Sequence, residues 1–402
     1  MRVAYVAFAP FVSGAERSLQ IMLLSAPNAG IDPIVLCPPG SKIIPWCREN
    51  NVRYVTAPLP DRDKWHAIRW FSSVYRVARI LRRERIDLVH SNQVWSMATA
   101  GAAARLVGIP RVCHMRDEVA TSGTLWWCKS GVEAVVCISH HIERQVAPAW
   151  ASKRRRPRIQ TLLNPVVVTA VDPIMSANIA PDTHTQREAR ARLGLNESAI
   201  VFGFIGQIVA VKGVLELLGA VAQITDPRWH LVIAGRDPHP GAPYEAECRL
   251  WVDRLGLKNR VTFLGFLENT RDFYESIDVA VVPSLEEPLG RIPLETASYG
   301  KPTIAFATGG LPETIVDGKT GWLVPTGDVN GLRTALAATL ADPEILQTAG
   351  KAARTYVVEH CSPDGYMRQL ATLYKELLTA KRASILGVAP PSPTQSTAGN
   401  TS

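Results

Sequence analysis

Two glutamates on either side of a glycine are the residues of this 402-residue chain best suited to chemistry. Glu287 and Glu295 flank Gly290 and Arg291, where a helix should begin after an apolar strand candidate. Pro293 suits the first helical turn, where a missing N–H has little cost. The unpaired amides at such a helix start favour a phosphate. The segment is typical of a site for a diphosphate with several hydroxyls, such as a nucleotide sugar, although a solvated loop and a first-turn charge also explain the spacing.

Lys212 is a second candidate for contact with an anion. It lies between a strand expected to end at Gly206 and a helix expected to begin near Gly213. A lysine is poorly placed at the positive end of a helix, so an anion nearby would explain it. An ordinary loop lysine is the alternative.

These segments resemble the signature of retaining glycosyltransferases of the GT-B fold, family four. The stretch from Glu287 to Glu295 is similar to the E-x7-E motif. Segments 297–302, 308–313 and 316–324 follow in the order and spacing of the family's EAxAxGxPVxA, GGxxE and GxxGxLV motifs. The resemblance covers roughly residues 2–380 and is densest in the C-terminal half.

The resemblance implies a donor site and a role for each of its charged residues. Lys212 would bind the donor diphosphate and stabilise the leaving group, Glu287 would position sugar hydroxyls, and Glu295 would bind the ribose. The family's usual arginine is Gln207 here, so Arg291 or a backbone amide would partly replace it. No metal and no cofactor is expected. The implied donor-binding residues are Gly14, Gly206, Gln207, Lys212, Gly235, Glu287, Leu289, Gly290, Arg291 and Glu295.

Further candidates follow strand-like segments of the N-terminal half. By resemblance, His114 would contact the transferred sugar and join Glu287 and Lys212 as a catalytic residue, with a buried core histidine as the alternative. His90 is expected to be structural. Residues 12–17 resemble the family's G-G-A-E loop. The acceptor-side candidates are Ser13, Arg116 and Asp117.

Short apolar runs alternate with longer helical patterns throughout the chain, which predicts an α/β fold with parallel sheets. We expect two tandem Rossmann-like, doubly wound domains, the GT-B arrangement, with a ligand cleft between them. Residues 1–168 would form the acceptor-side domain and residues 186–362 the nucleotide-sugar domain. A helix over 363–383 would pack back toward the first domain, and residues 386–402 would be disordered.

Charge is distributed unevenly along the chain. The net charge of +8 divides into +12 for residues 1–170 and −4 for the remainder. Residues 64–85 combine arginines with apolar residues at helical spacing, which fits a helix on an anionic membrane surface or a crossover helix with a solvated basic face. The sequence contains no helix-turn-helix, zinc finger or RNP motif, so we expect no nucleic-acid partner. Asp61 and Asp63 mimic a metal-binding D-x-D motif, but a helix N-cap explains them.

Seven scattered cysteines without a C-x-x-C motif indicate reduced thiols and a cytoplasmic protein, peripheral to the membrane if the basic helix binds it. The expected function is retaining transfer of a sugar from a nucleotide sugar to a glycan or lipid-linked acceptor in polysaccharide or glycolipid assembly. The alternatives are a nucleotide-sugar epimerase, a phosphorylase, or a non-catalytic scaffold that binds anionic lipid. The donor base, the sugar and the acceptor are left open.

Overall fold

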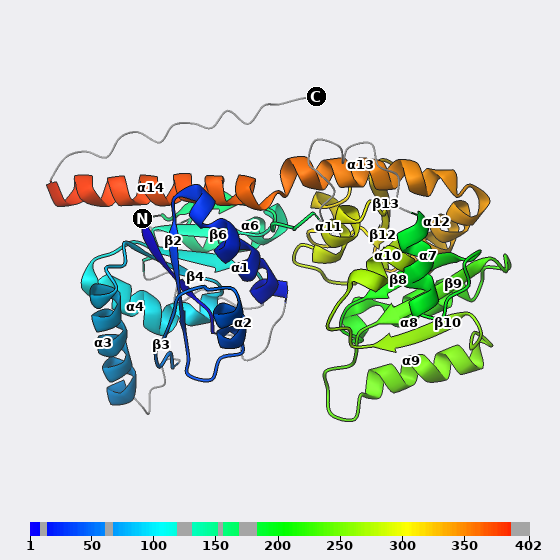
Figure 1. Ribbon diagram of the computed structural model, residues 1–402, viewed down its shortest axis with the longest axis horizontal. Helices are drawn as coiled ribbons and strands as arrows, with labels where there is room; N and C mark the ends of the chain where they lie inside the picture. The colour runs from blue at the N-terminus through cyan, green and yellow to red at the C-terminus, as the bar shows by residue number, and fades with distance from the viewer. Residues whose placement is uncertain (9–13, 61–66, 119–130, 152–155, 169–182, 387–402) are drawn as a thin grey trace. The chain divides into compact units, whose positions relative to one another are not determined.

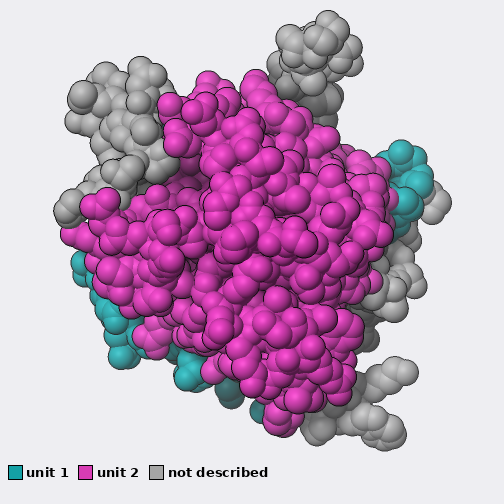
Figure 2. Space-filling model, turned by 90° about the vertical axis from the view of Figure 1, so that its right-hand side faces the viewer, with its two compact units in different colours: residues 1–136, 146–160, 366–402 teal, residues 137–145, 161–365 magenta. Residues whose placement is uncertain are grey.

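The computed structural model describes the chain except for residues 9–13, 61–66, 119–130, 152–155, 169–182 and 387–402 (Figure 1). The chain divides into two compact units, which Figure 2 colours separately. Unit 1 contains Met1–Val136, Val146–Gln160 and Tyr366–Ser402, and unit 2 contains Cys137–Gln145 and Thr161–Gly365. Ser13, the expected N-cap residues Asp61 and Asp63, and most of the C-terminal tail lie outside the described residues.

The first sheet has seven strands in the spatial order β3-β2-β1-β4-β5-β6-β7. The pairs from β3 to β5 run parallel, as the short apolar segments predict. The strand order reverses between β1 and β4, so their carboxyl ends flank the switch point of the sheet. The strands are β1 (Arg2–Val6), β2 (Asp32–Cys37), β3 (Tyr54–Thr56), β4 (Leu88–Ser91), β5 (Arg111–Met115), β6 (Ala134–Cys137) and β7 (Arg158–Thr161).

The second sheet has six strands in the order β10-β9-β8-β11-β12-β13, again with parallel pairing. Its switch point lies between β8 and β11. The strands are β8 (Ile200–Ile205), β9 (Trp229–Ala234), β10 (Val261–Gly265), β11 (Val279–Val282), β12 (Thr303–Phe306) and β13 (Gly321–Val324). The prediction of two doubly wound parallel sheets is confirmed.

The helices cover these sheets because alternate strand residues point to opposite faces. In β8, Phe202 and Phe204 join the core under α8, α9 and α12, whereas Val201 faces the core that contains α10. The helices are α1 (Gly14–Ser25), α2 (Ile43–Glu49), α3 (Ala67–Arg83), α4 (Met97–Val107), α6 (His140–Val146), α7 (Thr183–Arg192), α8 (Val214–Val221), α9 (Pro243–Arg254), α10 (Arg271–Ser276), α11 (Arg291–Ser298), α12 (Val329–Ala341), α13 (Glu344–His360) and α14 (Pro363–Leu386).

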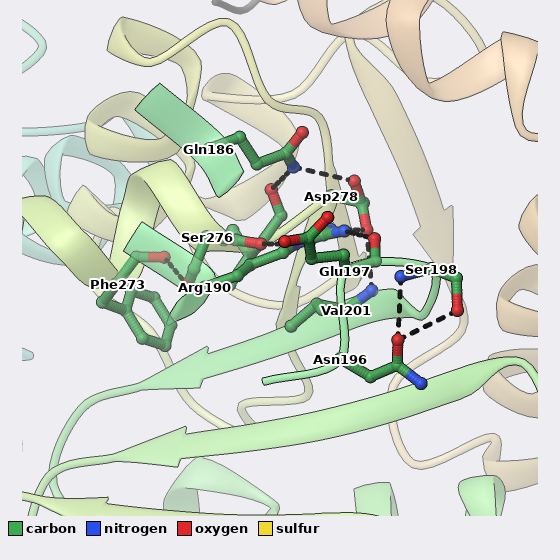
Figure 3. Close-up of polar contacts among 10 residues, drawn as sticks. Gln186, Arg190, Asn196, Glu197, Ser198, Val201, Phe273, Ser276 and Asp278 are labelled. Carbon is green, nitrogen blue, oxygen red and sulfur yellow. Dashed lines mark hydrogen bonds and ion pairs between the residues drawn. The ribbon is translucent and has the colours of Figure 1, made fainter. Parts of the chain in front are cut away.

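Helix α7 attaches to the second sheet through the buried guanidinium of Arg190 (Figure 3). This group donates to Asp278 Oδ2 at 2.5 Å, to the Ser276 carbonyl at 2.9 Å and to the Glu197 carbonyl at 2.7 Å. Asp278 also accepts from the backbone N–H of Val201 at 2.7 Å. The network therefore ties the segment before β8 to the start of β11.

Two segments that the sequence assigns to the first domain group with unit 2, namely 137–145 and 161–168. The Ser139 hydroxyl donates to the Pro288 carbonyl at 2.6 Å. The backbone N–H groups of His140 and His141 donate to the Glu313 carboxylate at 2.7 and 2.8 Å. These contacts hold 137–145 to unit 2, and the N–H of Val166 donates to the Cys361 carbonyl at 3.0 Å, which holds 161–168 to it.

Six cysteines lie among the described residues, and all six are buried free thiols. Within the described part of the chain, no helix has the length and apolar character needed to cross a membrane.

Candidate functional site

Lys212 and Glu287 meet at the switch point of the second sheet. Lys212 ends a single 3-10 turn (Ala210–Lys212) on the loop after β8, and Glu287 lies on the loop after β11. Lys212 Nζ donates to Glu287 Oε2 at 2.6 Å, and the Ser284 hydroxyl lies 3.4 Å from the same oxygen. The Lys212 and Glu287 side chains are 25% and 17% exposed. Open parallel sheets bind ligands at this position, outside the carboxyl ends of the strands at a switch point.

Backbone contacts hold the two loops in register. The N–H of Leu285 donates to the Val211 carbonyl at 2.8 Å, which joins the Lys212 loop to the Glu287 loop. The N–H of Gly310 donates to the Glu287 carbonyl at 2.9 Å. At Gly309, φ is +55°, and a Cβ atom would lie 1.9 Å from that carbonyl. Only glycine fits there, so the Gly309-Gly310 step of the family motif sets the backbone of Glu287.

Helix α11 begins directly after this loop. Its N-cap, Gly290, has φ of +92° and ψ of +83°, and Leu289 is 1% exposed. The first amides of the helix have no carbonyl acceptor within it, and the helix dipole makes this end positive. The start of α11 therefore suits an anion, and phosphate binding there stays a prediction.

Arg291 and Glu295 form a second charge pair on α11. The Arg291 guanidinium donates to Glu295 Oε1 at 2.8 Å, and the Tyr274 hydroxyl donates to Glu295 Oε2 at 2.7 Å. The Arg291 and Glu295 side chains are 14% and 15% exposed. The guanidinium that was expected to compensate for Gln207 is thus directed at Glu295, just as Lys212 is directed at Glu287, so a diphosphate would share each cation with a carboxylate.

The remaining donor-side predictions lie at the same sheet edge or in unit 1. Gly206 directly follows β8, where its N–H donates to the Ala234 carbonyl at 3.0 Å, and exposed Gln207 comes next. The N–H of Gly235, which follows β9, donates to the Gly265 carbonyl at 2.7 Å. Gly14 is the first residue of α1 in unit 1.

His114 lies inside a buried polar cluster of unit 1. The ring is 0% exposed, with Nδ1 3.2 Å from His90 Nε2 and 3.2 Å from the Arg116 guanidinium. Its Nε2 lies 3.4 Å from the Tyr366 hydroxyl of α14. Burial, assisted by the positive charge of Arg116, lowers the pKa of His114 well below 6.5. The ring is therefore neutral near pH 7, and its contact with a sugar stays a prediction.

The acceptor-side candidates occupy different surroundings. The Arg116 guanidinium donates to the Asn92 side-chain oxygen at 3.0 Å and is 5% exposed. Burial raises the pKa of Asp117. Arg116 therefore has a structural contact of its own, and any acceptor role for either residue stays a prediction.

Sequence reasoning missed one residue beside the Glu287 carboxylate in unit 2 and two residues beside the histidine cluster in unit 1. Ser284 lies 3.4 Å from the Glu287 carboxylate, and its position as the second residue after β11 was the available signal. Tyr366 and Tyr374 of α14 contact the histidine cluster, with the Tyr374 hydroxyl 2.5 Å from His90 Nδ1. The sequence places both tyrosines on the expected helix over 363–383, but their long separation in sequence from the histidines hides these contacts.

Family models match both halves of the chain. The family described as "Glycosyltransferase Family 4" matches residues 12–166, and the family described as "Glycosyl transferases group 1" matches residues 185–356. Together the two matches include all of the candidate donor-binding, catalytic and acceptor-side residues.

Characterised relatives point to the same family. The D-inositol 3-phosphate glycosyltransferase of Mycobacterium avium is 32% identical over 391 residues, covering 92% of this chain and 88% of that protein. The enzyme of the same name from Kribbella flavida is 34% identical over 212 residues, so the match spans about half of each protein, 50% and 48%. The lipopolysaccharide core biosynthesis mannosyltransferase LpsB of Rhizobium meliloti is 27% identical over 48% of this chain and 56% of that protein.

Solved structures share the fold at low sequence identity. A glycosyltransferase from Rickettsia africae superposes with a TM-score of 0.81 at 18% identity, covering 94% of this chain and 98% of that one. Anabaena HepE, solved in complex with UDP-glucose, gives a TM-score of 0.78 at 19% identity over 93% and 99% of the two chains. The two parallel sheets, the ordered motifs and the near full-length relative agree: this chain belongs to glycosyltransferase family 4 and has the GT-B fold.

Proposed function

We propose that this protein transfers a sugar from a nucleotide-sugar donor to a glycan or lipid-linked acceptor with retention of anomeric configuration. The observation that carries the proposal is the Lys212–Glu287 pair, 2.6 Å apart at the carboxyl edge of the second sheet and directly before the start of α11. It offers a cation and helix amides to a diphosphate beside a carboxylate that can accept hydrogen bonds from sugar hydroxyls.

Each charged group then has one task in the transfer. The bond between the anomeric carbon and the diphosphate oxygen breaks while a bond to the acceptor hydroxyl oxygen forms on the same face, and the acceptor proton passes to the leaving phosphate. Lys212 and the α11 amides stabilise the charge that develops on the leaving group. Glu287 positions the sugar hydroxyls, and Glu295, oriented by Tyr274 and Arg291, accepts hydrogen bonds from the ribose. Charge neutralisation by these groups is consistent with transfer that needs no metal.

Two similarities support a nucleotide-sugar donor. Residues 287–295 match the spacing of the E-x7-E motif of retaining enzymes. Anabaena HepE, which shares the fold, is the structure solved in complex with UDP-glucose. The nucleotide base and the sugar of the donor should be identified first. A thermal-shift screen against a panel of UDP-, GDP-, ADP- and dTDP-sugars does this.

Single-residue variants test the site with the donor so identified. We expect Glu287→Gln and Lys212→Met each to lower kcat/KM by about 100-fold or more, the scale of losing one transition-state charge contact. Glu286→Gln is the matched control, because this neighbouring glutamate is exposed. Near-wild-type turnover in both site variants would overturn the assignment.

The stereochemistry of the product tests the reaction class. Proton NMR of the fresh product should show the anomeric configuration of the donor. An inverted product refutes retention. Incubation of the donor without an acceptor separates the rival chemistries: an epimerised nucleotide sugar indicates an epimerase, and phosphate-dependent release of a sugar 1-phosphate indicates a phosphorylase.

A further inference from the structure

One face of helix α3 is buried in the core of unit 1. Val74, Val77, Ala78 and Leu81 are at most 7% exposed and pack in the core under the first sheet. This face accounts for the stability that α3 contributes, because burial of such apolar side chains is the main favourable term in folding. It does not account for the residues on the other side of the helix.

The outer face of α3 carries large apolar side chains in solvent. Ile68 is 87% exposed, Phe71 63% and Tyr75 59%. The spacings of three and four residues place them in one row along the helix. The Phe71 ring is held edge-on against Trp70, with the two centroids 5.0 Å apart. Single exposed apolar residues are ordinary on protein surfaces, but a row of three on one helix indicates an interaction site.

Arginines continue this outer face toward the C-terminus of the helix. Arg76, Arg79 and Arg82 are exposed, and the sequence has no acidic residue from 67 to 83. The next acid, Glu84, accepts from Arg53 at 2.9 Å and from Arg83 at 3.0 Å. The outer face therefore keeps a positive charge beside its apolar row.

We propose that the outer face of α3, formed by Ile68, Phe71, Tyr75, Arg76, Arg79 and Arg82, docks on an anionic lipid bilayer. An interfacial helix buries apolar side chains at the level of the acyl chains while its basic residues bind lipid headgroups. The helix has 17 residues and is about 25 Å long, so it can lie along the surface. A nucleic acid would bind the arginines but would leave Ile68 in water. This proposal is independent of the proposed sugar transfer.

Vesicle binding tests the surface with the full chain. Wild type should co-sediment with vesicles of phosphatidylcholine containing about 30% phosphatidylglycerol, and less so as NaCl rises from about 0.05 to about 0.5 M. The variant Arg76→Gln/Arg79→Gln/Arg82→Gln should partition about 100-fold more weakly, at roughly fivefold per arginine. The variant Ile68→Gln/Phe71→Gln/Tyr75→Gln should also lose binding, and its residual binding should depend on charge alone.

A matched charge control lies in unit 2. The variant Arg254→Gln/Lys258→Gln/Lys351→Gln removes three exposed positive charges and should bind vesicles like wild type. Equal losses in the control and the α3 arginine variant would show a non-specific charge effect and overturn the proposal. So would unchanged vesicle binding in the apolar variant, or tight binding to single-stranded RNA that depends on the same arginines. Far-ultraviolet circular dichroism of each variant verifies that the helix content is kept.

Discussion

Lys301 lies between α11 and β12 and is the one buried lysine among the residues that the structure describes, at 5% exposure. Burial lowers the pKa of Lys301 from 10.5 to about 8. The negative charges of Asp278 and Glu275 oppose this shift, and the positive charge of Arg190 adds to it. Asp278 already has a cationic partner in Arg190 (Figure 3). Lys301 is therefore not needed to neutralise Asp278, and its charge is a net cost to the fold. The perturbation that tests this is Lys301→Met.

The size and pH dependence of the effect follow from the lowered pKa. Below pH 8, Lys301 is charged in the folded and unfolded states, so the folded state bears the full cost, about 3 kcal/mol by the linkage of pKa to stability. Between about pH 8 and 10.5, the unfolded chain holds a proton that the folded chain has lost, and the cost disappears. Methionine has a similar volume without the charge, and such replacements of buried ions are often stabilising by about 1–4 kcal/mol.

The assay is urea unfolding of wild type and Lys301→Met from pH 7 to 10.5. The variant should exceed wild type by about 3 kcal/mol at pH 7, and the difference should shrink toward zero near pH 10.5. Other groups titrate equally in both proteins and cancel in the difference. Lys351→Met, at an exposed position on α13, should change the free energy of unfolding by less than about 0.5 kcal/mol. A less stable variant at pH 7, or a difference that does not vary with pH, refutes the reasoning.

Two further predictions concern the backbone of the site and the histidine cluster. Gly309→Ala should lower kcat at least tenfold, because its Cβ would lie 1.9 Å from the Glu287 carbonyl. The control Gly318→Ala should leave kcat near wild type, because Gly318 has a similar φ and no heavy atom lies within 4 Å of the new Cβ. Equal effects of the two variants on kcat would contradict the argument. Burial, with a smaller effect of the positive charge of Arg116, lowers the pKa of His90 to about 3. The free energy of unfolding should therefore fall as the pH drops from 6.5 toward 3, by up to about 1.4 kcal/mol per pH unit for each such histidine. His90→Gln should reduce that slope in urea titrations, and an unchanged slope would show that His90 is charged in the folded state.

The sequence predicts the strands well because the sheets are buried on both faces. The short apolar runs correspond to the strands of the two parallel sheets, and the strand expected to end at Gly206 ends at Ile205. Helix α13 was not anticipated, because its core-facing row contains the small residues Ala349, Gly350 and Ala353 and therefore shows little hydrophobic contrast. A Cβ at Gly350 would lie 2.0 Å from the Gly300 carbonyl, so this helix packs against the segment after α11 by backbone approach.

The pairing of charges at the site could not be predicted in the same way. Spacing placed Lys212 and Glu287 near the ends of different strands, but only the order β9-β8-β11 brings those ends together. The role of Arg291 was open for the same reason, since its partner Glu295 competes with any external anion. The burial of His114 depends on α14, whose tyrosines lie more than 250 residues away in the sequence.

The hydrogen bond between His90 and Tyr374 joins side chains that lie 284 residues apart in the sequence. A nascent chain can form this contact only after α14 has been synthesised. At about 5–20 residues per second, a ribosome needs roughly 15–60 s to make the chain between these two side chains. During that interval residues 161–365, which hold the whole second sheet, have emerged and can close their own core. The half of the protein that is synthesised first is therefore completed last, and its two buried histidines remain open to water until α14 arrives.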